Sequence, residues 1–309
     1  MFFLNFIILA LGLTALYFGA KLLIDGGSRL ASLMGIAPMV IGLTVVSIGT
    51  SLPELTIGIA SASNGHTSIS LGNIIGSNIC NLLLILAVAA VIRPLPMRDA
   101  TIRDDIPALV ASAGIVWILA SDGLLGRFDG IILLLAFALF TFFVLKKNKP
   151  SLPARKYPAN VKGISINIIM VLFGLGLLIL GGSGTVKSGV NIAKAIGIPE
   201  AIIALTLIAF GTSLPELVTC AVASYKKESQ IAVGNVLGSN ICNTLLVLGL
   251  VAVIEPIVIS PDLLKFSFPV MVLASMAVLP FSRIEKRFSR AEGIAFLIAY
   301  IIYIIAIVY

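Results

Sequence analysis

The chain has 309 residues, of which 59% are hydrophobic and 11% carry a charge, and its formal net charge is +7. A soluble domain carries about 25% charged residues, so this composition excludes a water-soluble globule and predicts that lipid is the solvent. The positive charge has an ordinary source in the basic loops of membrane proteins. No basic stripe interleaved with aromatic residues indicates a nucleic-acid partner.

A helix that crosses a bilayer needs about 20 mostly apolar residues, and ten segments of the chain meet this requirement. In chain order they lie near residues 2–22, 37–62, 69–92, 105–121, 128–146, 164–186, 199–224, 231–254, 266–282 and 291–308. The first of them lacks a basic n-region and a clear cleavage site, so we interpret it as a membrane helix and not as a removed signal peptide. The pattern predicts an all-α membrane protein with ten transmembrane helices.

Two motifs occur twice. GTSLPE at residues 49–54 recurs at 211–216, and GNIIGSNICN at 72–81 is matched by GNVLGSNICN at 234–243, each after 162 residues. We therefore predict an internal duplication, with one five-helix repeat at residues 1–146, a polar linker at 147–163 and a second repeat at 164–309. Because five is odd, the two repeats are expected to be inverted, an arrangement typical of secondary transporters whose site lies near the bilayer midplane.

Lysine and arginine are concentrated in the loops that follow odd-numbered spans, the central linker included. Basic loops remain in the cytoplasm. The bias predicts a multi-pass protein of the plasma membrane with a cytoplasmic linker and both termini extracellular.

Two acidic residues, Glu54 and Glu216, lie deep inside predicted spans and at equivalent places in the two repeats. Ionisable groups at such depth are costly and usually functional. A purely structural hydrogen bond would have to occur twice, at related positions, to explain both. By contrast, Lys21, Asp25, Lys187 and Lys194 lie near predicted span ends, where long side chains reach the interface, so we expect no role in the site for them.

The residues around each glutamate favour a hard cation. Pro53 and Pro215 lack an N–H and crowd the carbonyl four residues earlier, so each should kink or break its helix and free carbonyl oxygens. Hydroxyl side chains share the helix face of each glutamate. In the first repeat they are Ser47, Thr50 and Ser51; in the second they are Thr212 and Ser213, with Ala209 in place of the serine.

The second motif adds a polar stripe at a four-residue spacing in each repeat. The stripes consist of Asn73, Ser77 and Asn81, and of Asn235, Ser239 and Asn243. We expect Asn81 and Asn243 to reach the ions, and Asn73 and Asn235 to tie helices together. The glycines of each GxxxG pair (Gly72 with Gly76, Gly234 with Gly238) predict close helix packing. Cys80 and Cys242 are expected to serve packing, because thiolates are poor ligands for hard cations.

A carboxylate pair is neutralised by one Ca²⁺, two Na⁺ or two protons. An empty site would leave two like charges in a low dielectric, and it should resist any rearrangement that moves the site across the membrane. This electrostatic argument predicts exchange of one cation for another.

The doubled motifs resemble the α-repeats of the cation/calcium exchanger superfamily, above all its prokaryotic sodium/calcium exchangers, over nearly the whole chain. The resemblance implies calcium ligation by Glu54 and Glu216 with Thr50 and Thr212. It implies sodium sites at Ser51, Ser77, Ser213 and Ser239 with the carbonyls of Ser47 and Ala209. It further implies sliding of the spans near 2–22 and 164–186 over a core bundle. No cofactor and no obligatory protein partner are implied.

One position departs from the family pattern. Many sodium/calcium exchangers carry an aspartate where this chain has Asn243, opposite the asparagine that matches Asn81. With an amide at both positions, calcium transport is still expected, because two glutamates match a divalent charge. The ion stoichiometry and any need for K⁺ stay open.

Four alternatives remain beside Ca²⁺/Na⁺ exchange. They are a proton/calcium exchanger, an exchanger of another divalent ion such as Mg²⁺ or Mn²⁺, a passive channel, and an intramembrane enzyme that uses the paired carboxylates. No nucleophile–base pair, HExxH or nucleotide motif accompanies the acids, so we predict a transporter and not an enzyme.

Overall fold

A computed structural model describes residues 2–147, 161–196 and 209–308, and these are nearly all helical. Within these ranges, eight helices are long and apolar enough to cross a membrane, and one bent helix pair is a ninth candidate. The chain is therefore an integral membrane protein. The predicted seventh span, 199–224, is described only from Ala209, and residues 148–160 of the predicted linker lie outside the described residues.

The first half of the chain contains these elements in order: α1 (Phe2–Met34), α2 (Pro38–Ile41), the π-helical turn η1 (Gly42–Val46), α3 (Ser47–Thr50), α4 (Leu52–Ser63), α5 (Thr67–Cys80), the π-helical turn η2 (Asn81–Leu86), α6 (Ala87–Ile92), β1 (Leu95–Pro96), the π-helical turn η3 (Thr101–Asp105), α7 (Ile106–Leu119), the 3₁₀ turn η4 (Ala120–Asp122), β2 (Leu124–Leu125) and α8 (Arg127–Lys147).

The second half contains α9 (Val161–Ala195), α11 (Ala209–Gly211), α12 (Leu214–Tyr225), α13 (Ser229–Ile241), the π-helical turn η6 (Cys242–Val247), α14 (Leu248–Ile254), β3 (Ile257–Val258), the π-helical turn η7 (Leu263–Ser267), α15 (Phe268–Glu285), β4 (Arg287–Phe288) and α16 (Arg290–Val308).

The helices α1 and α9 are much longer than the spans predicted at 2–22 and 164–186. They contain 33 and 35 residues, or about 50 Å at 1.5 Å per residue, whereas the hydrocarbon core is about 30 Å thick. The predicted ends came from hydropathy, which shows where an apolar stretch ends but not where a helix ends. The helices continue through charged residues such as Asp25 and Lys187, which the prediction had placed near span ends.

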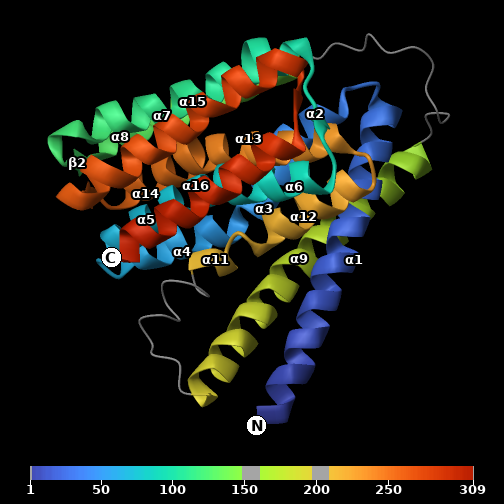
Figure 1. Cartoon of the computed structure of the whole chain (residues 1–309), viewed down its shortest axis with the longest axis horizontal. Helices are drawn as coiled ribbons and strands as arrows, with labels where there is room; N and C mark the ends of the chain where they lie inside the picture. The colour runs from blue at the N-terminus through green and yellow to red at the C-terminus, as the bar shows by residue number, and fades with distance from the viewer. Residues whose placement is uncertain (1, 148–160, 197–208, 309) are drawn as a thin grey trace.

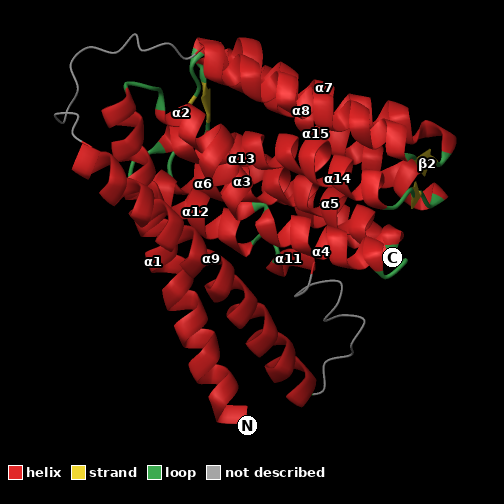
Figure 2. Ribbon diagram, turned by 180° about the vertical axis from the view of Figure 1, so that it is seen from behind, coloured by secondary structure: helices red, strands yellow, loops and turns green. Residues whose placement is uncertain are grey.

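A crossing of glycines joins α1 to α9. A Cβ on Gly12 would lie 3.0 Å from the Gly181 carbonyl oxygen, and a Cβ on Gly19 would lie 2.8 Å from that of Gly174. At the 162-residue offset, Gly12 is equivalent to Gly174 and Gly19 to Gly181, so each contact is the repeat counterpart of the other. The two helices run obliquely to the other helices, and one end of the pair projects beyond the bundle (Figures 1 and 2).

Two short strand ladders each pair a loop of the first half with a loop of the second half. Strand β1 pairs antiparallel with β4, and β2 pairs with β3. Because β1 and β3 are repeat equivalents, and β2 and β4 both precede the last helix of their half, each ladder is also the counterpart of the other. The ion pair between Lys286 and Asp99, at 2.8 Å, lies beside the β1–β4 ladder. The hydrogen bond and charge of Lys286 lower the pKa of Asp99.

Candidate ion-binding site

Each site glutamate lies in the first turn of a helix that follows a break. Pro53 and Pro215 occupy the second positions of α4 and α12, where a missing N–H costs nothing. The segments Pro38–Thr50 and Leu52–Ser63 meet at an angle of 41°, so the break predicted at Pro53 is confirmed. In the second half, residues 212–213 separate α11 from α12.

Glu54 is fully buried and contacts a hydroxyl group of α5 and one at the break before α12. The Ser77 hydroxyl donates to Glu54 Oε1 at 3.2 Å, and that of Ser213 lies 3.5 Å from the same oxygen. Ser213 also donates to Ser77 Oγ at 3.3 Å. The first carboxylate is therefore held by a side chain of the first repeat and one of the second.

Glu216 has the counterpart of the contact between Ser213 and Glu54. It is 1% exposed, and the Ser51 hydroxyl lies 3.5 Å from Glu216 Oε1. Thr50 Oγ1 lies 3.4 Å from Ser239 Oγ, and Ser77 Oγ lies 3.5 Å from Thr212 Oγ1. Each of these contacts has a counterpart in which the two halves of the chain are exchanged. The contacts bring together the two broken spans that carry Glu54 and Glu216 with the helices α5 and α13.

Unpartnered polar atoms are concentrated around these residues. Oε2 of Glu54 and Oε2 of Glu216 are buried without a hydrogen-bond partner, and so are the oxygen and nitrogen of both Asn81 and Asn243. These asparagines lie one helical turn beyond Ser77 and Ser239, within the π-helical turns η2 and η6, and such turns occur often at functional sites. Native proteins rarely leave buried polar atoms unpaired, so these residues indicate a place for ions or water.

Asn73 and Asn235 take a larger part in the site than the sequence predicted. Thr50 Oγ1 donates to Asn235 Oδ1 at 3.1 Å, and Thr212 Oγ1 donates to Asn73 Oδ1 at 3.3 Å. They tie helices together, as expected, but they do so through the two site threonines and so orient the threonine hydroxyls. The sequence did contain a sign of this role, because Asn73 and Asn235 occupy the same position in the two copies of the motif.

Other predicted site positions have a structural environment of their own. The Ser47 hydroxyl donates to the Leu43 carbonyl at 2.8 Å, and the Ser47 carbonyl accepts the N–H of Ser51 at 3.0 Å. Ala209 begins α11, and the surroundings of its side chain lie outside the described residues. The ligand roles of these two positions stay predictions.

The two GxxxG pairs differ in what the described residues show of their packing. A Cβ on Gly234 would lie 2.8 Å from the Met39 carbonyl oxygen, and one on Gly238 would lie 2.6 Å from Ser47 Oγ, so the close packing predicted for this pair is confirmed. For Gly72 and Gly76 no described atom lies within 4 Å of an added Cβ, and their close packing stays a prediction. Cys80 and Cys242 are buried and free.

Two polar contacts tie α1 to the turn between α12 and α13. Asp25 forms an ion pair with Lys226, and the Ser28 hydroxyl donates to Glu228 Oε1 at 2.8 Å. We call these contacts the α1 latch. Asp25 is therefore an ion-pair partner of Lys226, a contact that the sequence analysis did not predict.

The α1 latch has no counterpart in the other repeat. The equivalent positions are occupied by Lys187, Val190, Asn64 and His66. None of these four residues is acidic, so they cannot form the carboxylate contacts of the α1 latch.

Buried carboxylates, unpartnered amides and broken helices in a membrane bundle define an ion transporter. Residues 4–146 and 166–309 match the sodium/calcium exchanger protein family. The chain belongs to this family. It is accordingly a cation/calcium antiporter and not an enzyme, and it needs no cofactor for transport.

Known relatives and solved structures cover nearly the whole chain. The putative antiporter CaxA of Alkalimonas amylolytica is 34% identical over 96% of both chains. The sodium/calcium exchanger MaX1 of Methanosarcina acetivorans is 30% identical over 99% of both. A structure of the sodium-calcium exchanger NCX_Mj soaked with Na⁺ and Sr²⁺ is 30% identical, with a TM-score of 0.88 over 100% of this chain and 99% of that one.

Proposed function

We propose that this chain exchanges Ca²⁺ for Na⁺ by alternating access, with ions bound between two inverted five-helix repeats near the bilayer midplane. The repeats comprise residues 1–146 and 164–309, joined by a cytoplasmic linker at 147–163. The ligands are drawn from Glu54, Glu216, Thr50, Thr212, Ser51, Ser213, Ser77, Ser239, Asn81, Asn243 and the carbonyls of Ser47 and Ala209. Orientation follows from the basic loops, with both termini extracellular in the plasma membrane.

One observation carries this proposal. Two buried carboxylates from equivalent positions each contact a hydroxyl of the opposite repeat, and each keeps one oxygen without a partner. A buried charge without a partner is strongly destabilising. A bound cation removes this cost, and Ca²⁺ matches both charges with oxygen ligands alone.

The spacing of the hydroxyl and carboxylate oxygens supports ion binding. Hydroxyl hydrogen bonds are usually 2.7–2.8 Å long, whereas these contacts measure 3.2–3.5 Å. Two oxygens at right angles around a Ca²⁺ ion, each about 2.4 Å from it, lie about 3.4 Å apart. The longer spacing is compatible with oxygens that share a cation, and it supports the proposal.

Paired contacts support the inverted repeats. The glycine crossing of α1 with α9, the two strand ladders and the hydroxyl–carboxylate contacts each occur as two counterparts related by exchange of the halves. Such exchange is expected when two homologous units face each other across a pseudo-two-fold axis.

Sodium coupling is tested by reconstitution into vesicles. We expect an outwardly directed Na⁺ gradient, at equal pH on both sides, to drive Ca²⁺ uptake at least tenfold faster than a K⁺ gradient of equal size. Sodium is favoured by the names of MaX1 and NCX_Mj. Uptake driven by a proton gradient without Na⁺ would support the alternative, a proton/calcium exchanger, and equal flux without any gradient of counter-ion would indicate a channel.

The α1 latch should bias the balance between the two openings of the site. Its ion pair is partly exposed, so it contributes about 0.2–1 kcal/mol, and Asp25→Asn should shift that balance by up to about fivefold. The measurement is the ratio of half-saturating Ca²⁺ concentrations on the two sides of oriented vesicles. The reversed pair, Asp25→Lys with Lys226→Asp, should restore the parent ratio, and Lys187→Asn should leave it unchanged. An unaltered ratio in Asp25→Asn contradicts this role.

A further inference from the structure

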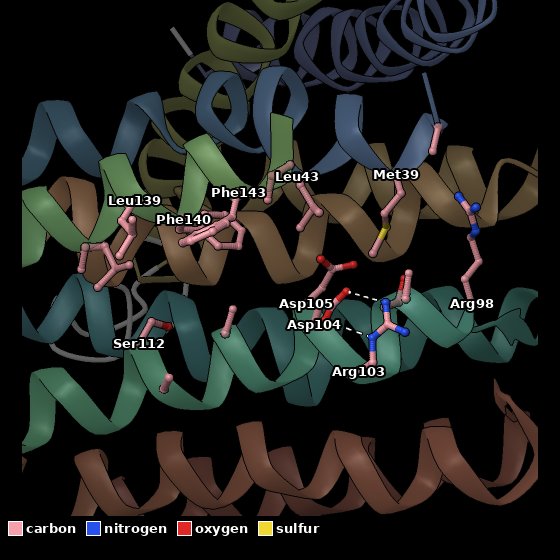
Figure 3. A pocket seen from close by; sticks show the side chains of 18 of the residues that line it. Met39, Leu43, Arg98, Arg103, Asp104, Asp105, Ser112, Leu139, Phe140 and Phe143 are labelled. Atoms are coloured by element: carbon pink, nitrogen blue, oxygen red, sulfur yellow. Dashed lines mark hydrogen bonds and ion pairs between the residues drawn. The ribbon is translucent and has the colours of Figure 1, made fainter. Parts of the chain in front are cut away.

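A cavity of about 770 Å³ lies between η1, α7 and α8, apart from the ion site. We call it the α7–α8 slot. Its lining includes Arg98, Arg103 and Asp104, and also Phe140 and Phe143 of α8. Figure 3 shows the charged side chains gathered toward one end of the slot and the aromatic side chains toward the other. The volume is within the range of sites that hold small organic ligands.

The slot is open because α7 presents small side chains to it. Ala108, Ala111 and Ser112 follow the spacing of one helix face and line the slot. At the 162-residue offset, the first two positions are occupied by the larger Val270 and Leu273.

The second repeat also differs from the first at the charged end. Phe266 stands at the position equivalent to Asp104, and its ring stacks on that of Tyr303 with centroids 6.0 Å apart. Larger or aromatic side chains therefore stand at three positions of the second repeat that are equivalent to slot-lining residues of the first.

The charged end offers one arginine for a ligand. Arg103 forms an ion pair with Asp104 at 3.2 Å, and Asp99 pairs with Lys286. Within the described part of the chain, no hydrogen bond or ion pair is formed by the exposed side chain of Arg98. A free guanidinium is a strong donor to phosphate oxygens.

The dimensions of the slot match one leaflet of a bilayer. Its wall along η3 and α7 runs from Thr101 to Ile115, or about 21 Å at 1.5 Å per residue. Half of the hydrocarbon core is about 15 Å, and the headgroup region adds several ångströms. The Arg98 guanidinium at the charged end, beside the paired Arg103 and Asp104 and beside Asp105, and the aromatic, apolar wall at the other end complement a molecule that has a phosphate and a long acyl chain.

We propose that the α7–α8 slot binds one glycerophospholipid, with its phosphate at Arg98 and an acyl chain against Phe140 and Phe143. The lipid would also contact the helices that carry the ion site. Leu43 and Leu245 line the slot; the Leu43 carbonyl accepts the Ser47 hydroxyl, and Leu245 lies two residues after Asn243. The lipid therefore supports the outer side of η1 and η6.

Native mass spectrometry of the purified, delipidated chain tests this proposal. Phosphatidylglycerol, phosphatidylethanolamine or a fatty acid of equal chain length is added back, and bound lipid per chain is measured. We expect one phospholipid retained by the parent. Arg98→Gln should weaken its binding at least fivefold. Ala108→Val with Ala111→Leu, which introduces the side chains of the second repeat, should weaken it at least tenfold. Arg93→Gln, an exposed arginine outside the slot, should bind as the parent does.

Retention of either phospholipid with this order of variants supports the proposal, and the stronger of the two identifies the headgroup. Failure of the parent to retain a phospholipid overturns it, and so does equal retention by the parent, Arg98→Gln and the filled slot. Fatty acid held as tightly as phospholipid overturns the assignment of phosphate to Arg98. If the filled-slot variant does not fold, Arg98→Gln against Arg93→Gln still decides between these outcomes. None of these measurements depends on which ions are exchanged.

Discussion

Glu54→Gln and Glu216→Gln should each reduce Ca²⁺ exchange at least 100-fold. The amide keeps the shape of the side chain but removes one of the two charges that a divalent ion requires. Loss of one partner of a buried ion pair costs about 3–5 kcal/mol, and each 1.4 kcal/mol corresponds to a factor of ten in affinity. The measurement is the initial rate of gradient-driven Ca²⁺ uptake into vesicles, together with the Ca²⁺ dissociation constant.

A stability measurement separates loss of the site from loss of the fold. Without divalent ions, the glutamine variants should unfold at the temperature of the parent or above it, because a buried charge has been removed. Added Ca²⁺ should stabilise the parent by mass action and leave the variants nearly unchanged. Glu255→Gln, at an exposed glutamate after α14, is the matched control and should behave as the parent does. Normal exchange by both site variants would show that the site assignment is wrong.

The glycine crossing should tolerate a methyl group at one position of α9 and not at another two residues away. A Cβ on Gly174 would lie 2.8 Å from the Gly19 carbonyl oxygen and 2.8 Å from the Leu23 nitrogen, and neither backbone atom can turn aside. Gly174→Ala should therefore separate α1 from α9 and lower the free energy of unfolding by about 1–3 kcal/mol. Exchange per folded molecule should fall with it, because these helices cover the site.

Gly176 provides the control on the same helix. Within the described residues, a Cβ on Gly176 meets no atom closer than 4 Å, and alanine is the better helix former. Gly176→Ala should thus be neutral or slightly stabilising. The two variants are compared by thermal unfolding in detergent and by the rate of Ca²⁺ uptake. Equal behaviour would mean that close contact of α1 with α9 contributes nothing to stability.

The sequence alone determined the membrane environment, the repeated motifs and the identity of the buried acids. These follow from local properties: a run of apolar residues needs no tertiary contact to be recognised, and a repeated motif is visible as letters. The helix break at Pro53 was equally predictable, because a missing N–H and a steric clash act within one turn. The roles of Ser47 and Ala209 as carbonyl ligands, and the cytoplasmic position of the linker, stay predictions.

Only the tertiary structure decided how these parts meet. The contact between Ser213 and Glu54 joins residues 159 positions apart, and the α1 latch joins residues about 200 apart, so no local pattern specifies them. The ends of α1 and α9 could not be predicted from the sequence either. A helix can extend beyond its apolar stretch when another helix packs against it. The open slot beside α7 depends in the same way on the distance between helices, and that distance is set by side chains from both halves of the chain.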